Sequence, residues 1–191
     1  MLGNKLIKVV ICIGSLLLLS SCGSDNAGGG AGEFTTVIMS ANTKTDRLEA
    51  DVITGNVCPS TTGTFKTETV DVDLVSKLYP NVAIPALPVR IYSYTVSYAP
   101  RTPVSPAIPA QSYSSGAVID PGTTTTLSIP VATDILKYKL VNDFNLQPCS
   151  ATMYEYHVSI TFNGAEIGGS GTSREIGPTN LDVAFADRQG T

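Results

Sequence analysis

The chain contains no tryptophan, a single histidine and few charged side chains. Charged residues make up 15% of its 191 positions, and the formal net charge of −4 is mild. Because binding to nucleic acid depends on clustered Lys and Arg, this composition argues against a nucleic-acid partner. Long helix-forming runs of Ala, Glu, Lys and Leu are also missing, whereas Thr, Ser, Val, Ile and Tyr are abundant, which favours strands.

The first 21 residues have the pattern of a secretory signal peptide. Lys5 and Lys8 precede an apolar stretch over residues 9–19, and the small residues Ser20 and Ser21 follow it. The stretch is shorter than the roughly 20 residues that a membrane-spanning helix needs, which disfavours a transmembrane segment. We therefore expect an exported protein whose mature part begins after residue 21.

The end of this segment, Leu19-Ser20-Ser21-Cys22, resembles the lipobox of bacterial lipoproteins. The resemblance implies that Cys22 becomes the new N-terminus and carries a thioether-linked diacylglyceryl group, usually with a further acyl chain on its amine. Two or three acyl chains attach a protein stably, whereas one does so only marginally. Gly23 stands where an aspartate favours retention in the inner membrane, so the resemblance points to the outer membrane and leaves its side open. Cleavage by an ordinary signal peptidase, with Cys22 as a plain thiol, is the alternative.

The mature chain divides into a tether and a single expected domain. Residues 22–33 comprise the lipidated cysteine and a glycine-rich stretch that has almost nothing to bury, which is typical of a flexible tether. About 170 residues remain after the signal peptide, enough for one sandwich or barrel with a real core, and no spacing suggests repeats. We expect that domain to span residues 34–191.

Four cysteines are present, and only two remain in the expected domain. Cys12 lies in the signal peptide and Cys22 at the lipidation site, which leaves Cys58 and Cys149. An oxidising compartment permits a disulfide between these two, and a pair of buried free thiols is the alternative. A structural zinc site needs four Cys or His ligands, more than this pair and His157 supply, so we expect no metal.

Alternation of apolar and polar residues is the main structural signal. Over residues 92–98, Tyr92, Tyr94, Val96 and Tyr98 fall on one face of a predicted strand. Residues 154–162 repeat the pattern, and Asn163-Gly164 then predicts a type I′ hairpin turn with a returning strand from about Ala165. Glycines at 168, 169 and 171 predict bulges or an early end to that pairing. Weaker strands are predicted at residues 35–40, 47–54, 67–74, 124–129 and 181–186.

These elements predict an all-β fold, an antiparallel β-sandwich of about eight strands with at most one or two short helices. Residues 133–143 fit either a short helix with Thr133 as N-cap or a strand, with the helix slightly favoured. The arrangement loosely resembles immunoglobulin-like or fibronectin-type domains found outside bacterial membranes. The chain lacks the core Trp of antibody domains and has Gln147 two residues before the second cysteine, where they have Tyr. A barrel or jelly roll is the alternative.

One segment is rich in proline, with Pro100, Pro103, Pro106 and Pro109 at every third residue around Arg101. Polyproline II has three residues per turn, so the prolines are predicted to form a ridge on an extended arm. The arm has two possible uses. It packs on its own domain as a stiff loop, which we favour, or it contacts a partner.

Candidates for catalysis or ligand binding are few. Glu155 and His157 share one face of a predicted strand and could form a hydrolytic triad with a distant serine, but a solvated outer face is the simpler interpretation. Asp71 and Asp73 could bind Ca²⁺ together with the loop residues Asp120, Asp134 and Asp143, yet no calcium-loop spacing supports this. The tyrosines of the two strands could form a sugar platform, although core packing is commoner.

We therefore expect a non-enzymatic envelope lipoprotein that serves as a binding, adhesion or structural module, with no catalytic residues and no cofactor. The membrane is one partner, through Cys22, and another envelope or extracellular protein or polymer is the expected second. A secreted hydrolase or small-ligand or carbohydrate binder that uses the face around His157 is the alternative.

Overall fold

The computed structural model describes residues 32–80 and 84–188. The predicted signal peptide, Cys22 and most of the predicted tether lie outside these ranges. The described residues form ten strands and one helix: β1 (Gly32–Glu33), β2 (Val37–Thr43), β3 (Arg47–Asp51), β4 (Glu68–Leu78), β5 (Val89–Pro100), β6 (Gln111–Ser114), β7 (Val118–Ile119), β8 (Thr124–Ala132), α1 (Asp134–Asn142), β9 (Tyr154–Glu166) and β10 (Arg174–Ala186).

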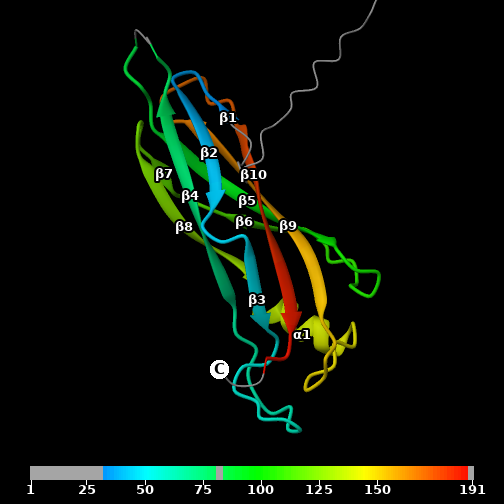
Figure 1. Ribbon diagram of the computed structural model, residues 1–191. Coiled ribbons are helices and arrows are strands. Elements are labelled where there is room, and N and C mark those ends of the chain that lie inside the picture. The colour runs from blue at the N-terminus through cyan, green and yellow to red at the C-terminus, as the bar shows by residue number, and fades with distance from the viewer. Residues whose placement is uncertain (1–31, 81–83, 189–191) are drawn as a thin grey trace, which may run out of the picture.

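The strands form two sheets that pack face to face as a sandwich (Figure 1). One sheet has the order β1-β2-β4-β8. The other has the order β3-β10-β9-β5-β6, with β7 also paired to β5. The prediction of an all-β sandwich is confirmed at this level. The expectation of purely antiparallel pairing is wrong at one position, since β3 runs parallel to β10.

The parallel pair arises because one stretch of chain changes sheets. β2 pairs with β4 in the first sheet up to Thr43, and β3 joins β10 in the second sheet from Arg47. Hydrogen bonds stabilise this crossing, because the Thr43 N–H donates to Thr179 Oγ1 and the Asp182 N–H donates to the Asp46 carbonyl. One edge of the sandwich is therefore closed by a strand segment that serves both sheets.

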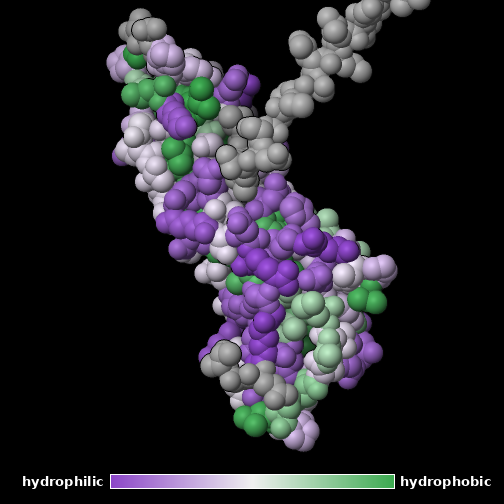
Figure 2. Space-filling model, viewed as in Figure 1, coloured by the Kyte–Doolittle hydropathy of each residue, from purple (hydrophilic) through white to green (hydrophobic). Residues whose placement is uncertain are grey.

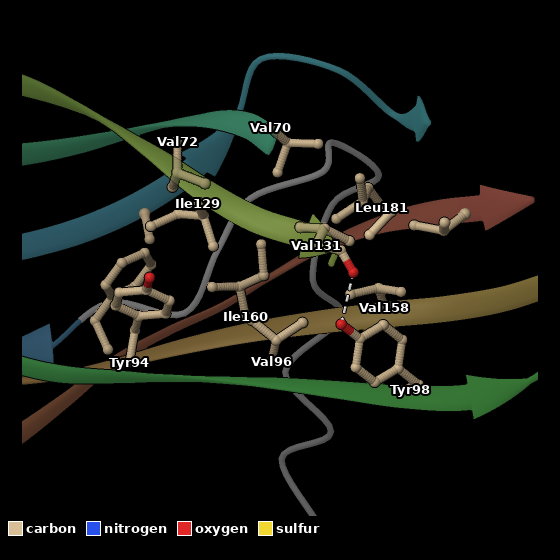
Figure 3. Close-up of a cluster of buried hydrophobic side chains, with 14 of the residues drawn as sticks. Val70, Val72, Tyr94, Val96, Tyr98, Ile129, Val131, Val158, Ile160 and Leu181 are labelled. Carbon is tan, nitrogen blue, oxygen red and sulfur yellow. Dashed lines mark hydrogen bonds between the residues drawn. The ribbon is translucent and has the colours of Figure 1, made fainter. Parts of the chain in front are cut away.

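The core lies between the sheets and is built from alternating residues of both (Figure 3). Tyr98 spans the two layers, because its hydroxyl donates to the Val131 carbonyl at 2.7 Å, and its burial raises the pKa of this phenol. Tyr94, Tyr154 and Tyr156 are buried as well. The interpretation of these tyrosines as core residues is confirmed. The labelled side chains are Val70, Val72, Tyr94, Val96, Tyr98, Ile129, Val131, Val158, Ile160 and Leu181.

Tyr92 is an exception, and its predicted inward orientation is wrong. The pairing of β5 with β9 shifts register between Ile91 and Ser93, so a bulge stands where simple alternation was expected. Val89 and Ile91 point inward before the bulge, and Tyr94 points inward after it. Because a bulge inserts one residue into the period of two, Tyr92 is turned to the solvent.

The predicted turn at Asn163-Gly164 is also wrong, because both residues continue strand β9. A side chain at position 164 would lie 2.7 Å from the Arg90 carbonyl, so glycine permits the close approach of β5 at this point. The hairpin turn falls instead between Glu166 and Arg174, where Gly168 and Gly171 adopt positive φ. The predicted returning strand from about Ala165 is therefore wrong too, because these glycines belong to the turn itself and β10 begins only at Arg174.

Residues 133–143 contain a helix, as favoured from the sequence. The side chain of Thr133 caps α1 by accepting from the Leu136 N–H at 3.2 Å. Leu136 and Leu140, four residues apart, face the sandwich and are buried. The helix thus covers one end of the core between β8 and β9.

Candidate binding groove beside the helix

A groove of about 660 Å³ lies beside α1. Three segments supply most of its apolar wall: the loop after β5, strand β6, and helix α1 together with Phe144 two residues beyond its end. This volume is within the range of sites that hold small ligands or the side chains of a partner. The principal apolar lining residues are Ile108, Pro109, Tyr113, Pro130, Ile135, Leu136 and Phe144.

The charged groups of the groove all come from α1 and its C-terminal cap. They are Asp134, Lys139 and Asp143. Among the described lining residues there is no histidine and no cysteine. The arrangement supports binding by apolar contact with a few polar groups, among them the Thr67 hydroxyl, which donates to Oδ1 of Asp134 at 3.3 Å.

The position of α1, and hence of one groove wall, depends on an ion pair between a buried lysine and a partly buried glutamate. Lys137 is completely buried, and its Nζ lies 2.5 Å from Oε1 of Glu68 on β4. The same carboxylate oxygen accepts the Asp51 N–H at 3.1 Å. Since a buried ammonium is strongly unfavourable without a partner, this pair holds the helix against the start of β4.

The outer side of α1 exposes large apolar side chains. Ile135 is 66% exposed and Tyr138 is 54% exposed, and the ring of Phe65 packs edge-on against Tyr138 at a centroid distance of 5.6 Å. A second hollow of about 490 Å³ lies between Thr64, Phe65 and these two helix residues. Contiguous exposed apolar surface of this kind is typical of interaction sites.

The proline-rich segment packs on its own domain. The Ser105 hydroxyl accepts the Glu155 N–H at 2.9 Å, and the Tyr156 hydroxyl donates to the Pro106 carbonyl at 2.9 Å. Ile108 is buried. These contacts agree with the stiff-loop interpretation. A turn in which the Ser105 N–H donates to the Thr102 carbonyl interrupts the expected polyproline ridge, because polyproline II has no internal hydrogen bonds.

The structure does not bring the predicted contact residues of this segment together. Pro109 lines the groove. Arg101 instead forms an ion pair with Asp182 on the outer face of the second sheet, and Pro100 is the last residue of β5. Pro103 is exposed on the intervening loop. Only the C-terminal end of the segment therefore contributes to the groove.

Glu155 and His157 share the outer face of β9, as predicted, but they do not pair with each other. Oε1 of Glu155 lies 3.2 Å from Nη2 of Arg47, and Nδ1 of His157 lies 3.2 Å from Oδ1 of Asp182. Neither residue lines the groove beside α1 or the second hollow next to Tyr138. The alternative of a hydrolase or ligand site at His157 gains no support from this geometry.

The predicted aspartate ligands are dispersed. Asp71 accepts the Ser128 hydroxyl at 2.6 Å, and Asp73 accepts the Thr126 hydroxyl at 2.5 Å and lies 3.2 Å from Nζ of Lys44. The Thr126 and Lys44 hydrogen bonds hold the pKa of Asp73 below its ordinary value. These are strand-surface contacts between β4 and its neighbours, with no shared cation position.

One group of three metal-ligand side chains occurs within residues 32–80 and 84–188: Cys58, Cys149 and Asp187. Cys58 and Cys149 are joined by a disulfide, as predicted, so their sulfurs are not thiolate ligands. Asp187 accepts hydrogen bonds from the Asn56 amide and the Cys149 N–H. The cluster therefore anchors the loop after β3 to the segment before β9.

Sequence reasoning missed the groove and the exposed side of α1. The available signal was the helix sequence itself, in which Leu136 and Leu140 form one apolar side while Ile135 and Tyr138 form another. A helix that packs on a core by one side needs only the first pair. The second pair predicts a further contact surface.

No family model, no curated protein and no solved structure matches this chain. Within the part of the chain that the structure describes, no helix is long and apolar enough to cross a membrane.

Proposed function

We propose that this protein is a membrane-anchored, non-enzymatic binding module of the cell envelope that captures an apolar protein segment in the groove beside α1. The groove flanked by the exposed Ile135 and Tyr138 is the observation that carries the proposal. The groove is lined mainly by apolar side chains, and its charged groups all come from α1 and its C-terminal cap. This arrangement suits the binding of a partner better than catalysis.

The anchor is the second part of the proposal. The lipobox resemblance of Leu19-Ser20-Ser21-Cys22 supports a diacylglyceryl group on Cys22, with the outer membrane as the site of attachment. The described chain begins at β1, and α1 lies at the opposite end of the sandwich (Figure 1). An anchor upstream of β1 thus leaves the groove at the end far from the attachment point.

The proposed occupant is an extended, apolar segment of another envelope or extracellular protein. Two groove residues, Gln111 and Tyr113, belong to β6, which is the last strand of its sheet. The backbone groups on the outer side of an edge strand are unpaired and can hydrogen-bond to an added strand. Strand addition at β6 would place alternate side chains of the partner in the apolar groove.

A photo-crosslinking amino acid at position 135 tests the groove. In membranes of the producing cell, we expect adducts whose crosslinked peptide is an extended apolar segment, and we expect Tyr138→Ser to weaken them severalfold. The matched control carries the same crosslinker at Tyr92, an exposed site on β5. Adducts of equal yield from both positions, or adducts only with small molecules, would contradict the proposal.

Replacement of Cys22 by Ser tests the anchor. The variant should lose labelling by a fatty-acid analogue and should leave the membrane fraction in high salt. A variant that still sediments with membranes would show that another feature holds the protein there.

The finer fold assignment, an immunoglobulin-like sandwich, is also a proposal. Its support is the strand order, because β2-β4-β8 and β10-β9-β5 correspond in chain order to the strands A-B-E and G-F-C of that architecture. The disulfide departs from the antibody pattern, since Cys58 and Cys149 lie in connections rather than on facing strands.

A further inference from the structure

The end of the sandwich that carries β1 has an exposed apolar surface of its own. Several strand ends meet there, because Val37 at the start of β2 lies beside Leu78 at the end of β4, and Val89 at the start of β5 lies beside both Ile119 and Glu166. Four large apolar side chains at this end are 38–56% exposed and form what we call the tether-end patch: Leu78, Ile84, Val118 and Ile167. Apolar side chains gather at the upper end in Figure 2.

The patch has a rigid base. Oε1 of Glu166 accepts both the Thr36 N–H at 2.7 Å and the Thr36 hydroxyl at 2.6 Å, and all these groups are buried. The Leu87 N–H donates to Thr36 Oγ1 at 3.0 Å, and the Ile167 N–H donates to the Pro88 carbonyl at 2.8 Å. The start of β2, the end of β9 and the approach to β5 are therefore held together.

The covalent distance to the anchor limits what can cover this patch. Only about ten residues separate Cys22 from Gly32, and a chain of that length spans at most roughly 33–36 Å. Gly32 belongs to β1, which pairs with Ile38 and Met39 at the same end of β2. A lipid on Cys22 thus keeps this end of the domain near the membrane.

We propose that the tether-end patch lies on the membrane surface, with its apolar side chains in the interface between headgroups and acyl chains. The inference rests on the proposed function, since the lipid on Cys22 supplies the anchor. Anchoring makes the second contact intramolecular, so a few apolar side chains suffice to orient the domain. The groove beside α1 then faces away from the membrane.

The charges around the patch indicate which lipid feature is recognised. Three cationic side chains are balanced by three anionic ones, all exposed at this end: Lys77, Arg90 and Arg174 against Glu33, Asp120 and Glu175. A balanced set gives little attraction to anionic headgroups. The contact should therefore form on phosphatidylcholine, which is zwitterionic with no net charge, and should persist in high salt.

The absence of tryptophan makes a direct test possible, because one introduced tryptophan is the sole indole reporter. Val118→Trp and Ile84→Trp place it in the patch, and Val57→Trp, at a position 77% exposed in the loop after β3 near α1, is the control. The mature chain from Cys22 is coupled through that thiol to a maleimide phospholipid in phosphatidylcholine vesicles, so the anchor is imposed. Emission is compared between ordinary and acyl-brominated vesicles.

We expect bromine to lower the emission of the two patch reporters by about half or more, because interfacial residues lie only about 5–10 Å deep. The control should be unaffected, and salt should change neither result. Equal quenching at all three positions, or none in the patch while the protein stays vesicle-bound, would overturn the inference. Fatty-acid labelling of Cys22 in cells decides separately whether the proposed anchor exists.

Discussion

At the scale of single residues, Glu166 forms the hydrogen bonds that hold the end of β9 to the start of β2. It is buried, and its carboxylate satisfies two donors of Thr36 that are themselves buried. Burial raises the pKa of Glu166, but hydrogen bonds from Thr36 and Thr35 outweigh this and hold the pKa below its ordinary value of 4.5. The ionised form is therefore favoured by folding.

This lowered pKa predicts acid sensitivity. The stabilisation from Glu166 is complete above the unfolded pKa near 4.5 and is lost as the pH falls through the lower folded pKa. Glu166→Gln should lower the free energy of unfolding at neutral pH by about 1–3 kcal/mol, because the amide oxygen accepts the Thr36 hydrogen bonds without the negative charge that strengthens them. The substitution should also make the free energy of unfolding less dependent on pH in the acid range.

Urea unfolding between pH 3 and pH 7 measures both effects. The control is Glu175→Gln, since Glu175 is exposed on β10. An unchanged acid profile in the Glu166 variant would mean that other carboxylates dominate the acid response.

At the scale of elements, α1 is held in part by an ion pair that the sequence did not reveal. The Thr133 cap and the helix itself follow from local sequence, because capping and helical spacing are local properties. The burial of Lys137 against Glu68 does not, since the two residues lie on elements that only the tertiary fold brings together. The groove beside α1 therefore depends both on local sequence and on tertiary contacts.

The ion pair predicts an asymmetry between its two partners. Glu68→Ala should destabilise the fold by about 3 kcal/mol, because the Lys137 ammonium is left buried without its partner. Lys137→Met should stay within about 1 kcal/mol of the wild type, since a side chain of similar size fills the same space. The double variant should recover most of the loss, as measured by urea unfolding. Equal damage from both single variants would contradict this account.

The two errors in strand prediction have the same origin at this scale. Tyr92 shares the alternation of its neighbours, and Asn163-Gly164 has the residues of a hairpin turn. In the fold, pairing between β5 and β9 overrides both signals, with a bulge after Ile91 and with Gly164 against the Arg90 carbonyl. Local patterns identify strands well, whereas register and turn position depend on the partner strand.

At the scale of the whole molecule, the disulfide joins distant parts of the chain. Cys58 and Cys149 are 91 residues apart and connect the loop after β3 to the segment before β9. All of β4, β5, β6, β7, β8 and α1 thus lie inside the closed loop. A crosslink of this span restricts the unfolded chain strongly.

Its removal should lower stability without changing the fold. The variant with both Cys58→Ser and Cys149→Ser should lose about 2–4 kcal/mol in urea unfolding, because the unfolded ensemble regains conformational freedom. Reduction of the wild type under mild conditions should give the same loss. A loss seen with the serine variant but not with reduction would point to a packing defect rather than to the crosslink.

The strand segment that passes from β2 to β3 makes the two edges of the sandwich unequal. One edge is fastened covalently and by the Thr43 and Asp182 hydrogen bonds, whereas β6 and β8 end their sheets at the other. Fluctuations that separate the two sheets should therefore be largest at the edge formed by β6 and β8. Amide hydrogen exchange should be fastest along these two strands. The groove lies at this less restrained edge. A partner segment that binds there would therefore also reduce the motion of the two sheets relative to each other.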